Sequence, residues 1–148
     1  MQVRNLLIGS AMLAFLAGCA SGPTEERADM AMDDAAVYEG TLPCRNCAGI
    51  DLSVNLRGDE QGEAAARTFD LRASYREHPQ DPPDEEYAGN WEVLSGTAVD
   101  PDATVYELTP DGEGQIYYFL RLDDQTLELI DPQRRRFQNS EALQLQRQ

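Results

Sequence analysis

The sequence contains no lysine, so all twelve of its basic residues are arginines. Aspartate and glutamate together number 27, which gives a formal net charge of −15 at pH 7. A chain with this excess of negative charge repels the phosphate backbone of nucleic acids, so we do not expect nucleic acid as a partner. We attribute the absence of lysine to genome composition or salt adaptation rather than to a recognition role.

The sequence also lacks two features that would mark other classes of protein. Its longest apolar run, residues 6–16, is well short of the roughly 20 residues that a membrane-spanning helix needs. Its only histidine, His78, has no serine or cysteine nearby in an arrangement of nucleophile and base. We therefore predict neither a permanent transmembrane anchor nor an enzyme, and we name no catalytic residue.

The start of the chain has the layout of a secretory signal. Arg4 supplies the positive charge, residues 6–16 supply the apolar run, and Ala17 and Gly18 supply small residues before a cleavage site. The tetrad Leu16-Ala17-Gly18-Cys19 resembles the lipobox of bacterial lipoproteins, in which the cysteine thiol is acylated before the signal is cut. We predict that residues 1–18 are a removable signal peptide and that Cys19 is the lipid-bearing first residue of the mature protein. The alternative is a signal peptide that merely contains a cysteine near its end.

Lipidation at Cys19 would determine where the protein resides. Each buried methylene of a fatty chain such as palmitate adds about 0.8 kcal/mol, so several chains attach a protein stably to a membrane. Ala20 and Ser21 stand where many lipoproteins of the inner membrane have an aspartate. We therefore expect a lipid anchor in the outer membrane, with the protein facing the periplasm.

Residues 19–36 predict a flexible tether. They are small and acidic and include no aromatic or branched apolar side chain, so they cannot bury enough surface to fold. About 17 residues of this kind reach roughly 20 to 25 Å on average, which would lift the folded part off the lipid surface. Met30 and Met32 lie here, and we interpret them as passive tether residues or as soft ligands for Cu(I).

From Val37 onward, short alternating runs separated by turn residues predict a single all-β domain, residues 37–148. Leu52, Val54 and Leu56 alternate with polar residues, and Trp91 and Val93 are expected to face inward. Prolines make residues 77–86 a long exposed loop. We predict about eight strands in a small antiparallel meander, closed as a barrel or stacked as a sandwich, at residues 37–42, 51–57, 69–75, 90–94, 104–108, 115–122, 126–130 and 142–146.

Cys44 and Cys47 form a C-x-x-C pair between the first two predicted strands. An exported chain meets oxidising conditions, so a disulfide is one interpretation, although so small a ring adds only about 2 kcal/mol. A thioredoxin-like redox centre needs a helix after the pair, and here a strand follows. A zinc site needs four ligands, whereas the chain offers these two thiols and His78. The fourth interpretation is two-coordinate Cu(I) held by both thiolates as a metal site.

Arg134, Arg135 and Arg136 form the only basic cluster of the sequence. They follow Asp131 and Pro132, which together indicate a turn. The cluster is therefore either a solvated turn before the last strand or a docking site for an anionic partner or a lipid headgroup.

At this point the sequence resembles a known family. The run Val37-Tyr38-Glu39-Gly40-Thr41-Leu42-Pro43-Cys44-x-x-Cys47-x-Gly49-Ile50-Asp51 is similar to the opening of the N-terminal domain of the NlpE copper-resistance and envelope-stress lipoproteins. Further likenesses are Gly89-Asn90-Trp91 and Leu127-Glu128-Leu129-Ile130-Asp131. The resemblance covers nearly all of residues 37–139.

The resemblance implies a lipocalin-like barrel, an outer-membrane anchor and a role without catalysis. Such lipoproteins signal copper excess, faulty lipoprotein traffic or surface contact to an envelope-stress sensor kinase. The family's cysteine pair carries over to Cys44 and Cys47, with its role left open. Two-domain members add an OB-like domain with its own cysteines, whereas this sequence stops near the end of the barrel, so we expect no redox signal through such a domain.

Three functions fit these observations. The first is a tethered, monomeric, non-enzymatic sensing or binding module linked to envelope stress and copper resistance. The second is a periplasmic Cu(I)-binding protein that uses Cys44 and Cys47, and the third is a lipocalin-like carrier whose barrel holds an apolar ligand.

Overall fold

The computed structural model describes residues 35–148. The predicted signal peptide, the predicted lipidation site Cys19, and Met30 and Met32 of the predicted tether lie outside these residues. Within the described part of the chain, no helix has the length and apolar character that a membrane crossing requires.

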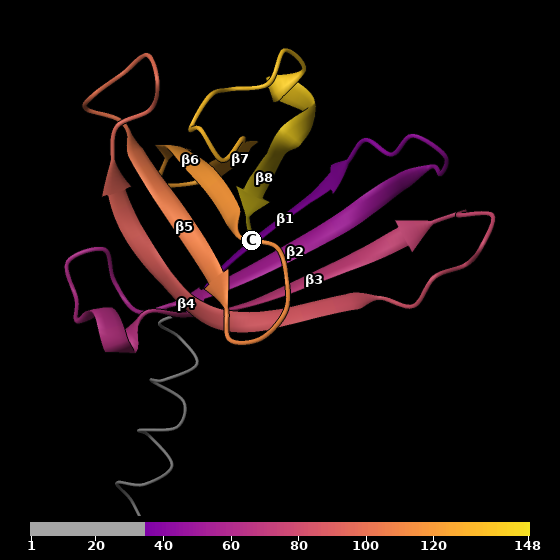
Figure 1. The fold of residues 1–148 in the computed structure, drawn as a ribbon, viewed down its shortest axis with the longest axis horizontal. Helices are drawn as coiled ribbons and strands as arrows, with labels where there is room; N and C mark the ends of the chain where they lie inside the picture. Colours follow the sequence, from indigo (N-terminus) through magenta and orange to yellow (C-terminus); the bar gives the residue numbers. More distant parts are fainter. Residues whose placement is uncertain (1–34) are drawn as a thin grey trace, which may run out of the picture.

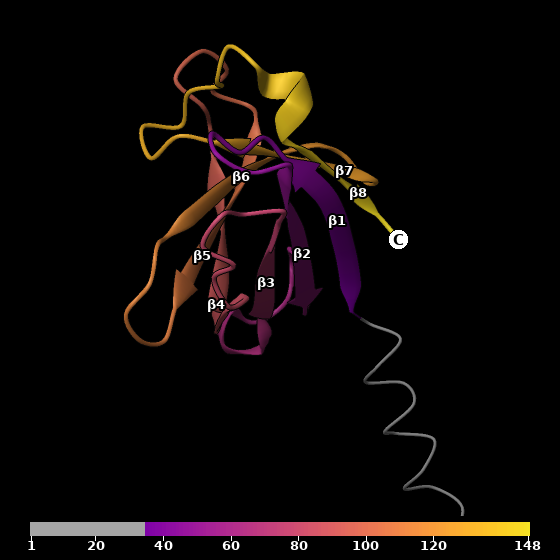
Figure 2. The ribbon, with the colours of Figure 1, turned by 90° about the vertical axis from the view of Figure 1, so that its right-hand side faces the viewer.

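Eight strands form one closed antiparallel barrel (Figures 1 and 2). Each strand pairs with the next along the chain, and the last pairs with the first. The predicted all-β meander is therefore confirmed, and it is closed as a barrel rather than stacked as a sandwich. The connections include two short 3₁₀ helices, η1 (Ala64–Ala66) and η2 (Ser140–Leu143). The strands are β1 (Ala36–Leu42), β2 (Gly49–Arg57), β3 (Thr68–Arg76), β4 (Glu85–Ser95), β5 (Thr104–Pro110), β6 (Tyr117–Asp123), β7 (Thr126–Ile130) and β8 (Gln144–Arg147).

The alternation of apolar and polar residues fixes which face of each strand lies inside. In β2, Leu52, Val54 and Leu56 are buried while the residues between them are half-buried. Cross-strand neighbours share a face, so these leucines and valine meet the buried side of β3. The resulting core fills the barrel with side chains, namely Tyr38, Leu42, Leu52, Val54, Leu56, Phe69, Leu71, Ala73, Trp91, Tyr106, Leu108, Phe119, Leu127, Leu143 and Leu145.

β4 begins earlier than the sequence indicates. The prediction of an exposed loop at 77–86 is wrong at its end, because Glu85 already pairs with Ala73 of β3. The inward positions at this end of β4 are held by Glu85, Tyr87 and Gly89, which do not read as an apolar face. Gly89 pairs with both β3 and β5, and a Cβ there would lie 2.0 Å from the carbonyl oxygen of Thr109. Only glycine lets β4 pass between its two neighbours at that point.

A second apolar cluster lies outside the barrel wall. Val105, Leu120 and Ile130 are buried there, with Leu94, Ala103 and Tyr118 packed against them. Their strands place them on the face opposite the core, since Tyr106, Phe119 and Leu127 point inward. The β4–β5 loop and the segment that follows β7 meet beside this cluster, and Ala98 N–H donates to the carbonyl oxygen of Arg134 at 2.9 Å.

The barrel closes through a short seam between β1 and β8. Only Tyr38↔Arg147 and Glu39↔Gln146 are in register there, fewer pairs than in any other ladder of residues 35–148. Gln148 N–H also donates to the carbonyl oxygen of Val37 at 2.8 Å. Both ends of the described chain therefore lie side by side.

The two ends of the barrel differ. We call the end where β1 begins, which also holds the β2–β3 loop with η1, the N-terminal end. We call the opposite end, which holds the β1–β2 loop and the β3–β4 loop, the disulfide end. Figure 1 shows these two loops side by side on the right, away from η1 on the left.

Candidate functional site

The loop between β1 and β2 carries the cysteine pair. Cys44 and Cys47 are joined by a disulfide, with 5.3 Å between their Cα atoms. Both cysteines are half-buried, while Arg45 and Asn46 between them are exposed. β2 begins at Gly49, two residues after the ring, so a strand follows the cysteine pair as predicted. A thioredoxin-like centre has a helix at this position.

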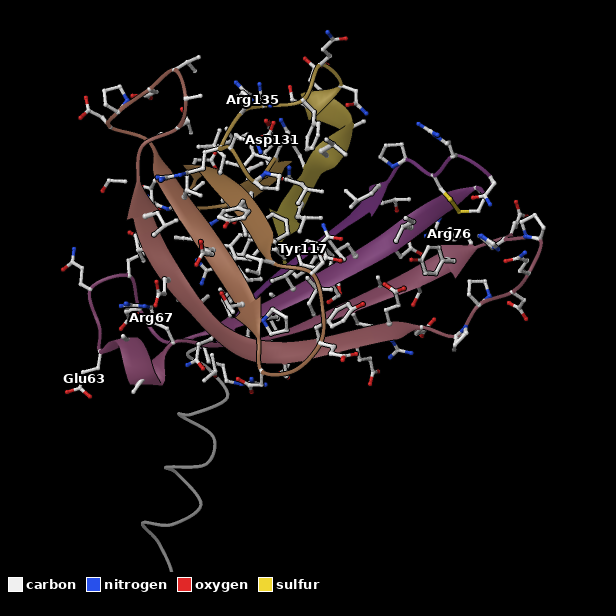
Figure 3. All side chains as sticks on the ribbon, in the orientation of Figure 1. Glu63, Arg67, Arg76, Tyr117, Asp131 and Arg135 are labelled. Carbon is white, nitrogen blue, oxygen red and sulfur yellow. A yellow bond between two sulfur atoms is a disulfide. The ribbon has the colours of Figure 1, made fainter. Side chains whose placement is uncertain are left out.

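Contacts from β1 and β3 hold this loop in place. Ala48 N–H donates to the carbonyl oxygen of Arg76 at 2.9 Å, which ties the loop to the end of β3. Asp51 accepts a hydrogen bond from the Thr41 hydroxyl at 2.7 Å and one from Nε of Arg76 at 2.5 Å. The Thr41 hydrogen bond and then the Arg76 hydrogen bond hold the pKa of Asp51 below its ordinary value. Figure 3 shows Arg76 at the same end of the barrel as the sulfur atoms.

His78 lies in the neighbouring β3–β4 loop and supports that loop. Its Nδ1 accepts a hydrogen bond from Gln80 N–H at 3.1 Å, and its ring meets Tyr75 edge to face, with 5.8 Å between centroids. Within residues 35–148, no three His, Cys, Asp or Glu side chains gather in a way that would hold a metal ion. The donor set at the loop is therefore the two sulfur atoms.

Arg134 and Arg136 fasten the segment after β7 to the barrel, and Arg135 binds within that segment. Arg134 donates from Nη1 to the carbonyl oxygens of Ser95 and Gly96, at 3.2 and 3.1 Å. Arg135 donates from Nε to Asp131 at 3.1 Å. The cluster is thus a solvated turn before the last strand, with the side chains of Arg135 and Arg136 62% and 45% exposed, and its guanidinium groups bind atoms of their own chain.

Arg136 makes the strongest of these contacts. Its Nε and Nη2 each donate to one carboxylate oxygen of Glu128, both at 2.7 Å, and the Glu128 side chain is 0% exposed. This hydrogen-bonded carboxylate raises the pKa of Arg136. The sequence analysis missed the pair, since Glu128 reads as an ordinary outward residue between Leu127 and Leu129.

A second polar network, also missed, closes the N-terminal end. Glu60 of the β2–β3 loop accepts a hydrogen bond from the Tyr106 hydroxyl and pairs with Nε of Arg121 at 3.1 Å. Burial first, and then Glu60, raises the pKa of Tyr106. Arg67 stabilises the same loop by donating to the carbonyl oxygen of Gly62 at 2.8 Å while its guanidinium lies over the ring of Trp91.

The interior leaves little room for a ligand. The hollow at the N-terminal end has a volume of about 180 Å³, is open to solvent, and has charged groups such as Arg121 and Asp124 in its lining. A larger hollow of about 450 Å³ lies over β2, β3 and β4, where Asn55, Asp70 and Arg72 contribute to its lining. An apolar carrier needs a dry, apolar chamber, and these open hollows lack that character.

Comparison with known proteins identifies the fold. A protein-family model described as the NlpE N-terminal domain matches residues 38–140, more than half of the chain. The chain belongs to the NlpE family. The match begins in β1 and ends at the start of η2, so the NlpE domain includes the whole disulfide loop, and the resemblance drawn from the sequence is confirmed. No curated protein and no solved structure matches the chain.

Proposed function

We propose that this NlpE-family chain is a lipoprotein of the outer membrane that senses or binds without catalysis, in envelope stress and copper resistance. The observation that carries the proposal is the family match over residues 38–140, because it takes in the cysteine pair and the strands that hold it. The lipobox-like tetrad ending at Cys19 supports the anchor. The family implies that the signal passes to an envelope-stress sensor kinase.

The geometry of the disulfide end supports contact with another protein. The disulfide closes the loop between Pro43 and Ala48 into a ring, and a backbone hydrogen bond ties the loop to β3, so its conformation is fixed before a partner binds. Preorganised loops lose little conformational entropy on binding, which favours recognition. Arg45 and Asn46 are the exposed side chains that the ring presents.

The anchor is tested first with the Cys19→Ser variant of the full chain. We expect the unaltered protein to partition into the detergent phase and to fractionate with the outer membrane, and the variant to remain in the aqueous phase. Mass spectrometry of the mature N-terminus checks the same point. An unaltered chain that begins elsewhere and carries no acyl chains would contradict the anchor.

The signalling role is tested in a strain that lacks the gene. We expect deletion to lower copper tolerance and overproduction to raise the output of an envelope-stress reporter. The double variant Cys44→Ser/Cys47→Ser should weaken both effects. The matched control is Ala64→Ser/Ala66→Ser, which introduces two serines at exposed positions of η1, at the opposite end of the barrel. Unchanged tolerance and reporter output in the deletion strain would overturn the role.

A second function is favoured by the two sulfur atoms themselves. After reduction of the disulfide, Cys44 and Cys47 would offer two thiolates from Cα atoms 5.3 Å apart, a donor set that suits two-coordinate Cu(I) and falls short of the four ligands of structural zinc. We expect the reduced chain to take Cu(I) from a moderate chelator, and the double serine variant to leave the chelator loaded. If the reduced, unaltered chain takes no copper, this function is wrong.

A further inference from the structure

A carboxylate faces into the barrel at the disulfide end. Glu85 pairs with Ala73, which is buried in the core, so its side of β4 is the inner side. Its neighbour Glu86 points to the outer wall and is exposed, whereas Glu85 is half-buried. An inward carboxylate at the mouth of an apolar barrel needs a partner, because partial burial costs a charged group its hydration.

Tyrosines from three strands surround this carboxylate. The hydroxyl of Tyr87 donates to Oε2 of Glu85 at 3.4 Å, and the rings of Tyr87 and Tyr117 lie 6.4 Å apart, tilted by 50°. Burial first, and then the charge of Glu85 and a hydrogen bond with it, raises the pKa of Tyr75 of β3. Burial, with Tyr87 and Glu85, raises the pKa of Tyr117 to about 12, so its phenol is neutral at physiological pH. Tyr117, labelled in Figure 3, lies on the inward face of β6 with the core residue Phe119, and the centroids of their rings are 6.2 Å apart.

No positive side chain of the described residues pairs with Glu85. The nearest arginine on β3, Arg72, binds Asp84 at 2.5 Å and lies 3.9 Å from Glu86 on the outer wall. Arg76 is committed to Asp51. The other arginines that form ion pairs within residues 35–148 bind other carboxylates, and none of these pairs includes Glu85.

We propose that Tyr75, Tyr87, Tyr117 and Glu85, which we call the tyrosine cage, bind the ammonium group of an organic cation. The faces of tyrosine rings attract cations through their quadrupole, and the carboxylate supplies the opposite charge. A single carboxylate with phenols is a poor donor set for a metal ion, whereas an alkylammonium can contact both rings and carboxylate. The ammonium comes from a free amine or from a lysine side chain of a partner protein.

Binding is measured with n-butylammonium chloride added to the full chain, purified in detergent, while the ring signals of all six tyrosines are followed by NMR. We expect saturable shifts at Tyr75, Tyr87 and Tyr117. Tyr38 and Tyr106 at the N-terminal end and Tyr118 on the outer wall are internal controls and should stay in place. Equal shifts with sodium chloride, or equal shifts at all six rings, would overturn the proposal.

Two adjacent carboxylates give a matched pair of variants. Glu85→Gln should weaken butylammonium binding by about tenfold, because the counter-charge is lost. Glu86→Gln removes the same charge one residue away on the other face and should change binding by less than about twofold. If both variants bind alike, net charge rather than the cage explains the shifts, and the proposal is wrong.

A second pair of variants tests the ring. Tyr87→Phe keeps the aromatic face and loses only the hydroxyl, so it should retain most of the binding, whereas Tyr87→Leu should lose it. Tyr87→Phe binding no better than Tyr87→Leu would contradict a contact through the ring face. Tighter binding of Nα-acetyl-lysine amide than of butylammonium would assign the ammonium to a protein side chain, and equal binding would assign it to a free amine.

Discussion

Two arginine–carboxylate pairs on opposite sides of the barrel show how burial changes the role of the same chemistry. Arg136 and Glu128 meet where the carboxylate is 0% exposed, and they join the segment after β7 to the wall. Arg76 and Asp51 meet beside the disulfide loop, where their side chains are 58% and 38% exposed. In the first pair the carboxylate is shielded from water, although the Arg136 side chain is 45% exposed, whereas both partners of the second pair are partly hydrated. The segment after β7 therefore depends on its ion pair for stability, and the disulfide end uses its pair mainly to orient a loop.

Among the variants that test this comparison, Arg136→Ala should cause the largest loss of stability. This change leaves the buried carboxylate of Glu128 without its cation. Breaking a fully buried pair costs about 3 to 5 kcal/mol of unfolding free energy, and because the Arg136 side chain is 45% exposed we expect a loss at the lower end, about 3 kcal/mol. Urea denaturation followed by circular dichroism measures the loss. The matched control is Arg135→Ala, whose partner Asp131 is reached by an exposed guanidinium and whose loss should cost at most about 1 kcal/mol. Similar losses for the two variants would refute the distinction.

A smaller effect is expected from Cys44→Ser/Cys47→Ser. Opening so short a ring relieves the unfolded chain of a small constraint, so we expect a loss of about 2 kcal/mol and a barrel that still folds. Thermal unfolding of the two proteins, each with and without reductant, checks this value. A reductant effect on the serine variant would show that the change in stability has another origin.

The smallest loss of stability is expected for the exposed pair of Arg76 and Asp51. Arg76→Ala should lower the unfolding free energy by less than about 1 kcal/mol, and salt should reduce the difference further, since both partners are solvated. Urea titrations at low and high salt give the two numbers. A loss as large as that of Arg136→Ala would mean that exposure does not decide the strength of these pairs.

The pH dependence of the Arg76 pair has a definite sign. The pKa of Asp51 is lowered in the folded state, so its contribution to stability is present above the unfolded value and is lost as the pH falls through the folded value. The difference between the unaltered chain and Arg76→Ala should thus persist near neutral pH, begin to shrink near the ordinary aspartate pKa of about 3.9, and vanish only below the lowered pKa of folded Asp51. A difference that grows on acidification would contradict this assignment.

Much of the fold could be predicted because inward positions alternate with polar ones. β2 shows this clearly, with Leu52, Val54 and Leu56 on one face. The start of β4 escaped prediction because its inward positions are Glu85, Tyr87 and Gly89, and the pairing that defines them comes from β3 rather than from a local pattern. A carboxylate at an inward position is invisible to any count of apolar residues.

The position of the cysteine loop could be predicted from the sequence, whereas the chemical state of its two sulfur atoms could not. The spacing of Cys44 and Cys47 located the loop, but spacing alone left disulfide, redox, zinc and copper interpretations open, and the disulfide appears in the structure. The partners of the arginine cluster could not be predicted from sequence. Glu128, which binds Arg136, lies eight residues away across a turn, and only its burial in the fold distinguishes it from other carboxylates. Polar partnerships of this kind depend on tertiary packing.

The short seam between β1 and β8 has a consequence for how the protein is made. Every other ladder joins strands that follow one another, so hairpins can form in order as the polypeptide emerges, while the seam must bring together the first and last strands. Until β8 has been synthesised, the barrel stays open along β1 with an unpaired strand edge, and in that interval the chain is vulnerable to proteases and to edge-to-edge aggregation.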